Sequence, residues 1–324
     1  MKVFVAGATG ALGKQLVPML VSQGHDVTGM TRTRAKQDLI RELGARPAVA
    51  DALDPEAVAQ VVAEAEPEAV IHELTDLTGT FARNIDKSFA TTNRLRTEGM
   101  DHLLAAAKAA RARRFIAQSF AGWPFEPTGG PVKSEDDPLQ QNPPKTVSQS
   151  LAAIRHVEDM TRDDGIEGFA LRYGGFYGPG TSLALDPPGE FTELIRKRRV
   201  PIIGDGGGIW SLVHIADAAA ATAAALERGA PGVYNVVDDD PVPVRELLPE
   251  IARMIGAKPP RHLPRWVGRI AAGEPGVLVM TEIRGASNEK AKRELGWELR
   301  YPSWRLGFRE GLEQNDGEPA RSAA

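Results

Sequence analysis

The chain begins with a short apolar segment that runs directly into glycines at three-residue spacing. Residues 2–6 have the pattern of a buried strand, and Gly7, Gly10 and Gly13 follow at once. A helical pattern then covers residues 11–22, and Gly24 is placed to end it. Such a turn brings bare backbone N–H groups and a helix N-terminus toward an anion, because no Cβ blocks the approach. This order predicts a dinucleotide pocket that contacts Gly7, Thr9, Gly10, Ala11, Leu12 and Gly13.

Strand and helix patterns alternate through the first half of the chain. Strands are expected at 26–30, 48–50, 69–72, 114–118 and 168–172, and helices at 34–43, 55–64, 93–110 and 146–163. The run from Ala69 to His72 has no polar alternation, which is typical of a parallel strand buried on both faces. Repeated βα units predict an α/β fold, a doubly wound Rossmann-type parallel sheet with helices on both faces.

The composition changes after residue 173, where glycines and prolines crowd into loops. A helix at 215–227 and a strand at 232–236 indicate a return to the sheet before a smaller, mainly helical lobe begins near residue 244. We therefore expect a dinucleotide-binding domain over 1–173, with its sheet completed by about 211–237. A substrate-binding lobe is expected over 174–210 and 238–312, and a disordered tail over 313–324.

Composition excludes several kinds of site. The chain has no cysteine, which removes disulfides, thiolate metal sites and cysteine nucleophiles, and its six histidines lack metal-ligand spacing. A formal net charge of -4 gives no general attraction for nucleic acid or anionic lipid. No stretch approaches the roughly 20 apolar residues of a membrane span, and the first strand leaves no room for a signal peptide. We expect a cytoplasmic protein that acts on a small molecule.

Six landmarks in order resemble the extended short-chain dehydrogenase/reductase family, of the NAD(P)-dependent epimerase/dehydratase type. They are the glycine loop, Asp51, Asn93, Leu171-Arg172 with Tyr177-Gly178-Pro179-Gly180, Val213-His214-Ile215-Ala216-Asp217, and Glu294-Leu295-Gly296-Trp297. The resemblance extends from Lys2 to about Leu312. It implies that Asp51 and Ala52 lie near the adenine, that Leu74 and Thr75 lie along the cofactor, and that Asn93 belongs to the same site. It also implies a homodimer through the helices at 93–110 and 146–163.

The end of the second predicted strand favours NADP over NAD. An NAD pocket usually places a carboxylate there for the ribose 2′-hydroxyl, whereas this chain has Thr31, Arg32 and Arg34. Arginines can bind a 2′-phosphate, and the threonine hydroxyl adds a donor. The alternative is that both arginines are solvated charges on a surface turn.

The family's proton-transfer pair, Tyr-x-x-x-Lys, is absent. In the matching helix its places fall on Ser150 and Ile154, and no tyrosine of the chain has a lysine four residues later. The lysine of such a pair lowers the tyrosine pKa, so that the phenol exchanges a proton while hydride moves. A serine hydroxyl beside an isoleucine cannot replace that acid.

Four residues remain as candidate catalytic groups. Ser119 follows the strand at 114–118, Tyr173 and Tyr177 follow the strand at 168–172, and Glu73 follows the strand at 69–72. Each has a structural alternative: a strand-end serine, rings that line the cofactor pocket, or a solvated loop carboxylate. For His214 we favour a structural role over catalysis.

These patterns leave three functions open. The first is an NADP(H)-dependent enzyme that reduces or epimerises a carbonyl-bearing or sugar-like small molecule with a non-standard proton donor. The second is a non-redox isomerase or dehydratase that keeps the dinucleotide as a structural group, with Glu73 or Asp76 moving the proton. The third is a sensor that binds NADP(H) without turnover. Fold alone does not separate them, because function depends on the site.

Overall fold

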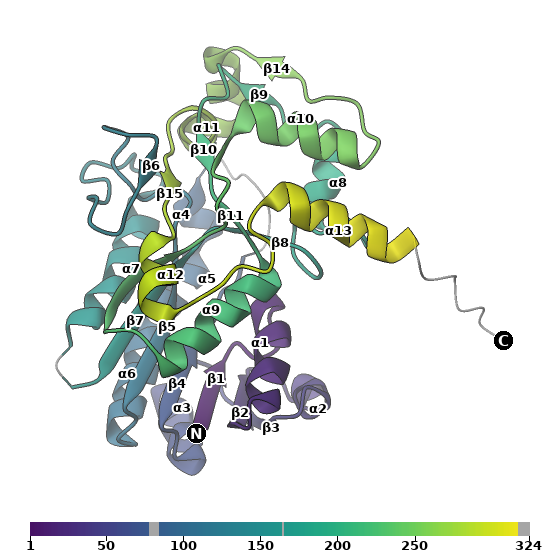
Figure 1. Cartoon of the computed structure of the whole chain (residues 1–324). Coiled ribbons are helices and arrows are strands. Elements are labelled where there is room, and N and C mark those ends of the chain that lie inside the picture. Colours follow the sequence, from purple (N-terminus) through teal and green to yellow (C-terminus); the bar gives the residue numbers. More distant parts are fainter. Residues whose placement is uncertain (78–83, 164, 317–324) are drawn as a thin grey trace.

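A seven-stranded parallel sheet forms the centre of the protein. The computed structural model describes residues 1–77, 84–163 and 165–316 (Figure 1). All neighbouring strands of the sheet are parallel. Their spatial order is β12 (Gly232–Val236), β7 (Glu167–Tyr173), β5 (Arg114–Phe120), β4 (Ala69–His72), β1 (Lys2–Ala6), β2 (Asp26–Thr31) and β3 (Arg46–Val49). The predicted doubly wound α/β fold is confirmed.

The strand order reverses between β1 and β4, and this position locates the site. From β1 the chain winds outward through β2 and β3, then returns to β4 on the other side of β1. The crossovers on the two sides leave a crevice at the carboxyl ends of β1 and β4, where ligands of such sheets bind. The glycine loop follows β1 and Glu73 follows β4, so both lie at this crevice.

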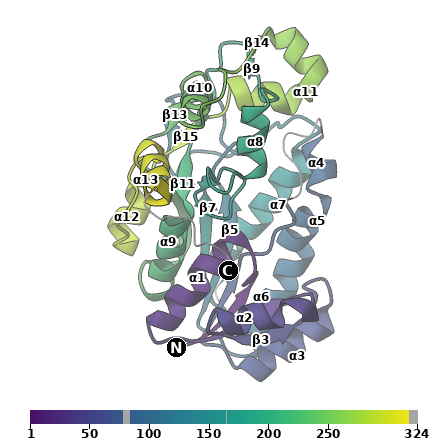
Figure 2. The ribbon, with the colours of Figure 1, turned by 90° about the vertical axis from the view of Figure 1, so that its right-hand side faces the viewer.

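Helices cover both faces of the sheet (Figure 2). Side chains Val3 and Val5 of β1 point to one face, and Phe4 and Ala6 to the other, as strand alternation requires. The first face is covered by α1 (Ala11–Ser22), α2 (Gln37–Glu42), α9 (Ile215–Glu227) and α12 (Glu289–Leu295). The second face is covered by α3 (Pro55–Ala65), α6 (Met100–Ala109) and α7 (Ser148–Asp159), and α5 (Ala90–Arg94) packs beside α7.

A second group of elements packs around its own apolar core above the carboxyl edge of the sheet (Figure 1). Its helices are α8 (Glu190–Arg196), α10 (Val244–Met254), α11 (Arg265–Thr281) and α13 (Trp304–Asp316). Short strand pairs join them: β8 (Gly175–Tyr177) with β11 (Leu212–His214), β9 (Ile202–Ile203) with β14 (His262–Leu263), and β10 (Ile209–Trp210) with β13 (Val242–Pro243). In addition, β6 (Val132–Lys133) pairs with β15 (Gly285–Ala286), and α4 (Ile85–Ser88) precedes α5.

The predicted long helices are divided. Between α5 and α6 lies a π-helical turn, η2 (Leu95–Gly99), where the Thr97 hydroxyl donates to the Asn93 carbonyl at 2.9 Å. Such a bond to the preceding turn competes with regular helix geometry. The helix predicted at 146–163 is α7 followed by a 3₁₀ turn, η3 (Met160–Arg162), and the turn η1 (Arg34–Lys36) precedes α2. Helix α13 continues to Asp316, past the predicted start of the tail, and residues 317–324 lie outside the described part of the chain.

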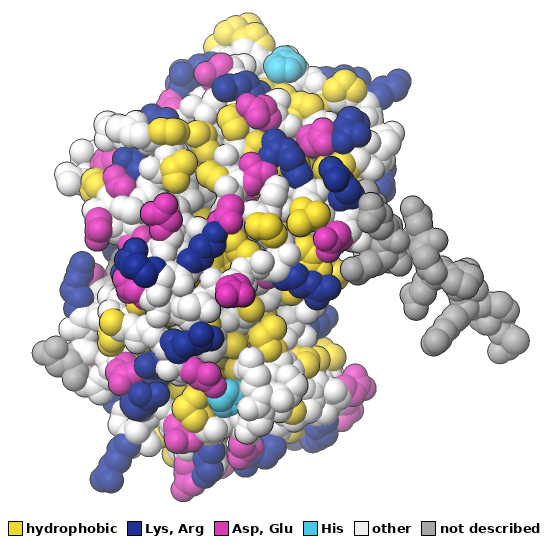
Figure 3. Space-filling view, viewed as in Figure 1, with side chains coloured by type: hydrophobic (Ala, Val, Ile, Leu, Met, Phe, Trp, Pro, Cys, Tyr) yellow, Lys and Arg dark blue, Asp and Glu magenta, His cyan; other side chains and the backbone are white. Residues whose placement is uncertain are grey.

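The exterior mixes both signs of charge. On the face shown in Figure 3, Lys and Arg side chains alternate with Asp and Glu side chains. Within residues 1–77, 84–163 and 165–316, no helix combines the length and the apolar character that crossing a membrane requires.

Candidate functional site

The glycine loop forms one wall of a cleft at the carboxyl edge of the sheet. Gly7 has a φ of 101°, and a Cβ placed on it would lie 2.8 Å from the carbonyl carbon and oxygen of Glu73. Only glycine fits this position, because both the left-handed backbone and the neighbouring chain reject a side chain. Helix α1 begins at Ala11, directly after the loop, so its free N–H groups lie beside the cleft. An anion would find backbone donors here.

The cleft has a volume of about 270 Å³ and contains most of the predicted cofactor residues. It is lined by Gly7, Thr9, Gly10, Thr31, Arg32, Asp51, Ala52, Leu74 and Thr75, as expected for a dinucleotide site. Sequence reasoning missed Met30, Lys36, Ala50, Leu53, Thr91 and Leu95, whose positions depend on how neighbouring strands end together. Together, the lining residues form a groove with both polar and apolar walls, which runs from the glycine loop past the ends of β2 and β4.

Five predicted cofactor residues lie outside the lining of this cleft: Ala11, Leu12, Gly13, Arg34 and Asn93. Leu12 is buried in the core beneath α1, and Ala11 packs beside that core. Gly13 lies against the backbone of Gly7 and Ala8, so it allows the helix to approach the loop. Asn93 is buried, and its side-chain nitrogen donates to the Ser150 hydroxyl at 3.1 Å.

Two cations face the cleft at the end of β2. They are Arg32 and Lys36, whereas Arg34 points into a separate polar groove beside β3 and α3. Both Arg32 and Lys36 are exposed, and neither forms an ion pair with the residues that the structure describes. At this strand end, Arg32 and Lys36 line the cleft, whereas the sequence indicates Arg32 and Arg34. A lysine two residues beyond Arg34 could not be chosen from the sequence, because the η1 turn decides which side chains face the cleft.

Glu73 belongs to a buried hydrogen-bonded chain. The Tyr173 hydroxyl lies 2.9 Å from Glu73 Oε1 and 2.7 Å from Thr222 Oγ1, and the Thr222 hydroxyl donates to the Ala218 carbonyl at 2.7 Å. Burial raises the pKa of Glu73 to about 8 and also raises that of Tyr173. The structure thus brings together two of the four predicted catalytic groups, and Glu73 also lines the cleft.

The other tyrosine candidate lies elsewhere. Tyr177 is fully buried in the core of the second group of elements, where its ring contacts those of His214 and Phe308. Its hydroxyl has no hydrogen-bond partner among the described residues. Burial raises the pKa of Tyr177 well above its ordinary value. This ring packs a core and lines neither the cleft nor the cavity described below.

Ser119 is engaged in a buried ionic cluster. Its hydroxyl donates to Glu158 Oε1 at 2.9 Å, and Arg172 donates to both oxygens of the same carboxylate at 2.6 and 2.7 Å. All three side chains are buried, and they join β5, α7 and β7. Because the Ser119 proton is already donated, the hydroxyl is a structural contact.

Ser150 and Ile154, the two positions to which the sequence assigns the places of the Tyr-Lys pair, both make packing or capping contacts. Ser150 is fully buried, and Asp86 accepts hydrogen bonds from the backbone N–H groups of Gln149 and Ser150 and from the Ser150 hydroxyl. Asp86 therefore caps the start of α7, a role with no local sequence signal, because the two residues are far apart in the chain. Ile154 packs in an apolar cluster with Trp123, Val147 and Leu151.

The two conspicuous histidines are structural. The Nδ1 atom of His214 accepts the backbone N–H of Ala216 at 3.2 Å and so caps α9. Burial lowers the pKa of His214 to about 4, and burial likewise lowers that of His72 to about 4. Both rings are neutral at ordinary pH. In the described part of the chain, no three histidine or carboxylate side chains gather in a way that would hold a metal ion.

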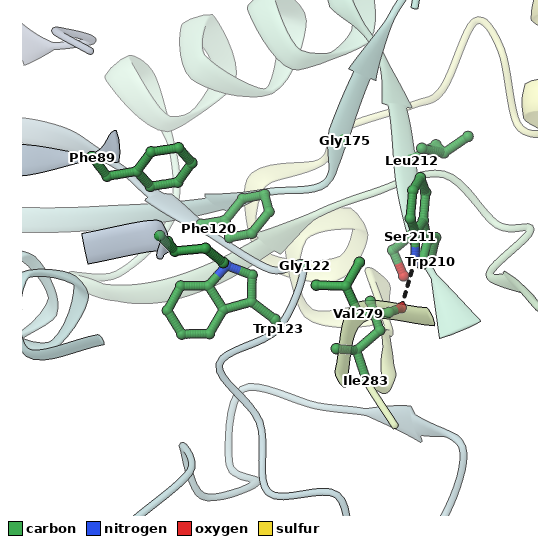
Figure 4. Close-up of a pocket in the computed structure, with 11 residues that line it drawn as sticks. Phe89, Phe120, Gly122, Trp123, Gly175, Trp210, Ser211, Leu212, Val279 and Ile283 are labelled. Carbon is green, nitrogen blue, oxygen red and sulfur yellow. Dashed lines mark hydrogen bonds between the residues drawn. The ribbon is translucent and has the colours of Figure 1, made fainter. Parts of the chain in front are cut away.

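A second, apolar cavity lies beside the ends of β5 and β8. It measures about 220 Å³, and Phe120 and Trp123 face Trp210, Val279 and Ile283 across it (Figure 4). The remaining lining residues are Ile85, Phe89, Gly122, Gly175, Ser211 and Leu212. The Trp210 indole N–H is bound to the Val279 carbonyl at 3.0 Å. None of the described lining residues carries a charge.

Gly122 gives this cavity its shape. A Cβ at this position would lie 2.2 Å from the tip of the Phe120 ring, so the ring folds over the glycine. The Phe120 and Trp123 rings meet edge to face at a centroid distance of 6.4 Å. The cavity therefore offers aromatic surface to a flat, uncharged or cationic ligand.

Comparison with known proteins agrees with this geometry. The sequence model of the NAD dependent epimerase/dehydratase family matches residues 3–236. The chain is 41% identical to a 3-diazoavenalumate denitrifying reductase from a Streptomyces species, over 95% of this chain and 99% of the relative. It is 26% identical to a 4-hydroxy-2-methyl-3-oxo-4-farnesyl-3,4-dihydroquinoline-1-oxide ketoreductase from Stigmatella aurantiaca, over 97% and 95% of the two chains.

Solved structures show the same fold. A UDP-glucose 4-epimerase from Thermotoga maritima superposes with a TM-score of 0.76 at 22% identity and covers 98% of this chain and 99% of its own. The UDP-glucose 4-epimerase from Thermus thermophilus, solved with NAD, gives 0.73 at 23% identity over 98% and 100% of the two chains.

Proposed function

The chain belongs to the NAD dependent epimerase/dehydratase family, and on that premise we propose that it is an NADPH-dependent reductase of a planar aromatic substrate. The observation that carries the proposal is the uncharged aromatic cavity at the sheet edge that also bears the dinucleotide cleft. Members of this family are NAD(P)-dependent oxidoreductases and epimerases, which supports an enzyme with a dinucleotide cofactor.

The cofactor would be held by the glycine loop and the cations after β2. Gly7 and Gly10 carry no side chain that would block a pyrophosphate from the N–H groups at the start of α1, and Asp51 also lines the cleft, where the resemblance implies the adenine. Arg32 and Lys36 supply positive charge for a 2′-phosphate, and no carboxylate follows β2 to receive a free 2′-hydroxyl. NADPH is therefore the preferred dinucleotide.

The cavity favours an aromatic ligand over a nucleotide sugar. The nucleoside diphosphate of a nucleotide sugar carries phosphates, which proteins bind with arginine, lysine or helix N-termini. The described lining of this cavity has four aromatic rings and no cation. This narrows the carbonyl-bearing or sugar-like substrate expected from the sequence to a flat, largely apolar molecule.

The described lining of the apolar cavity offers no ionisable proton donor, which favours a reduction that needs none. No lining residue of the cavity that the structure describes is ionisable, and Ser150 and Ile154 replace the usual acid and its partner. The similar Streptomyces enzyme is named as a denitrifying reductase of a diazo compound. We propose the same chemistry here, on an aromatic diazonium ion.

Such a reaction balances without an acid from the protein. A bound NADPH would supply a hydride. The ring carbon of the substrate would gain one C–H bond and lose its C–N bond, and the electrons of the broken bond would leave with N₂. The protein would exclude water and orient the ring between Phe120 and Trp210. Aromatic faces also attract a cationic ligand. Reduction of a carbonyl would instead require a proton at the developing alkoxide.

The test is turnover of an aromatic diazonium probe, 3-diazonio-4-hydroxycinnamate, with deuteride-labelled NADPH. We expect loss of the NADPH absorbance, release of N₂ and deuterium at the ring carbon, above a control without enzyme. Ser119→Ala is a matched control and should keep kcat within about twofold, because that hydroxyl is bound to Glu158. Converted substrate with unchanged NADPH would favour a non-redox enzyme. Tight binding without turnover would favour a sensor.

Cofactor choice is tested separately by binding. The wild-type protein should bind NADPH more tightly than NADH, and Arg32→Ala and Lys36→Ala should each weaken NADPH binding by about tenfold while leaving NADH nearly unchanged. Arg34→Ala is the control, because Arg34 faces a different groove. Tighter binding of NADH by the wild-type protein would contradict this assignment.

A further inference from the structure

Glu73 places a carboxyl group where an anionic cofactor would bind. The residue directly follows β4, is partly buried, and lines the cleft together with Gly7 and Gly10. Its backbone carbonyl group lies 2.8 Å, and its Cβ 3.2 Å, from the position a Cβ would take on Gly7. An ionised carboxylate this close to the glycine loop would repel a pyrophosphate, since like charges in a poorly solvated site interact strongly.

A count of protons along the buried chain indicates that this carboxyl is not ionised. Three contacts join Glu73, Tyr173, Thr222 and the Ala218 carbonyl, with oxygen–oxygen distances of 2.9, 2.7 and 2.7 Å. The carbonyl only accepts, and each of the two hydroxyls has one proton to donate. All three contacts are hydrogen bonds at once only when the carboxyl supplies the third proton. The chain then runs from Glu73 to Tyr173, to Thr222, to Ala218.

The surroundings of Glu73 favour the neutral form. Tyr173 and Thr222 are buried, so water cannot readily replace a missing proton in the chain. Burial also raises the pKa of Glu73 to about 8. The ionisable neighbours are Tyr173 on β7 and the neutral His72 on β4, while the glycine loop and α9 present Gly7 and Thr222. The cleft's other charges are Arg32, Lys36, Asp51 and Asp76, and no cation among the described residues pairs with Glu73.

We infer that Glu73 is a neutral cofactor-contact residue, protonated when the dinucleotide binds, and that loss of its proton releases the cofactor. This inference rests on the proposed NADPH site. It gives Glu73 a binding role in place of the general base considered from the sequence, because a protonated carboxyl cannot accept a proton. The ligand concerned is the anionic pyrophosphate of a nicotinamide dinucleotide.

The experiment measures dissociation constants of NADPH and NADH by nucleotide fluorescence from about pH 6 to about pH 10. For the wild-type protein, we expect binding to weaken by about tenfold between about pH 7 and about pH 9 for both nucleotides. NADH is essential, because it lacks the 2′-phosphate, which itself titrates. Glu73→Gln keeps the shape and supplies an amide N–H donor to Tyr173 in place of the carboxyl proton, and should bind both nucleotides with a nearly constant dissociation constant across this range.

Two further variants isolate the effect. Asp76→Asn neutralises another carboxylate of the same cleft and should retain the tenfold pH dependence. Tyr173→Phe removes the hydroxyl that bonds to Glu73 but leaves the carboxyl beside the glycine loop, and should therefore keep the pH dependence. A thermal melt of each variant confirms that it is folded.

The outcomes separate the two proposals. Glu73→Gln with an undiminished pH dependence, or a wild-type dissociation constant that does not change with pH, would overturn this inference and leave the NADPH site intact. Absence of nucleotide binding at every pH would instead contradict the proposed cofactor.

Discussion

Two buried tyrosines differ in whether their hydroxyl groups have partners. The Tyr177 hydroxyl has none among the described residues, while that of Tyr234 donates to the Ala230 carbonyl at 2.6 Å and lies 3.0 Å from Glu294. An unpaired buried hydroxyl has lost its water without compensation. We therefore expect Tyr177→Phe to raise the free energy of unfolding by about 1 kcal/mol and Tyr234→Phe to lower it by about 1 kcal/mol. Urea unfolding measures both, and a loss of stability in Tyr177→Phe would contradict the assignment.

The Glu73 carboxyl also makes stability depend on pH. In the unfolded chain the group ionises near its ordinary value of 4.5, but in the folded protein it keeps its proton until about pH 8. Between these values the folded state binds more protons, so rising pH lowers the free energy of unfolding. Glu73→Gln cannot ionise, so it removes this pH dependence of the free energy of unfolding. Its stability relative to wild type should increase by on the order of 3 kcal/mol between about pH 5 and about pH 9.

A change of stability with pH in the opposite direction would contradict this prediction. If wild type gained stability relative to Glu73→Gln as pH rose through this range, the folded carboxyl would have to be ionised. Chemical unfolding at several pH values distinguishes the two cases, with Asp76→Asn as the control for another carboxylate of the same cleft.

Among the helices, α7 is fixed to the sheet by one buried carboxylate. Glu158 accepts two hydrogen bonds from Arg172 on β7 and one from Ser119 on β5. Glu158→Ala leaves the Arg172 charge buried without a partner, which should cost about 3 to 5 kcal/mol of stability. Ser119→Ala removes only a neutral donor and should cost about 1 kcal/mol. Equal losses in urea unfolding would contradict the role given to the ion pair.

The start of α7 illustrates what a local pattern leaves open. The apolar positions Leu151, Ile154 and Val157 indicate a helix, and all three are buried. Its first turn depends on Asp86, which is more than 60 positions away in the sequence and accepts the N–H groups of Gln149 and Ser150. The helix itself was therefore predictable, while its beginning depends on a tertiary contact.

At the level of the complete fold, the chain leaves the sheet after β7 and returns with α9 and β12. Helix α9 packs on α1 in one core, and β12 pairs with β7. The two groups of elements are therefore interleaved, and we expect a single cooperative unfolding transition. NADPH at a hundred times its dissociation constant should add about 2.7 kcal/mol to the free energy of unfolding. Calorimetry with and without NADPH checks this, and two separate transitions would contradict it.

Two expectations at this level stay predictions. One is the division into a dinucleotide-binding domain over 1–173 and a substrate-binding lobe over 174–210 and 238–312. The other is the homodimer through the helices at 93–110 and 146–163, which sedimentation of the purified protein would test.

The sequence alone predicted the fold and most of the residues that line the cleft beside the glycine loop. The periodicity of strands and helices is a local property of the sequence. The glycines at positions 7 and 10 indicate a tight turn between the two, so the strand, turn and helix start of residues 2–13 were predictable from those residues alone. The sequence also predicts that the Tyr-Lys pair is absent, because no tyrosine of the chain has a lysine four residues later.

Only the tertiary structure decided what the remaining polar groups do. Ser119, Tyr173 and Tyr177 all lie at or near the carboxyl ends of strands, β5, β7 and β8, yet one binds Glu158, one binds Glu73, and one is buried without a partner among the described residues. The apolar cavity likewise combines Phe120 with Trp210 and Ile283 from distant segments. Hydrogen-bond partners and burial depend on which segments meet in space, and a linear pattern of residue types does not contain that information.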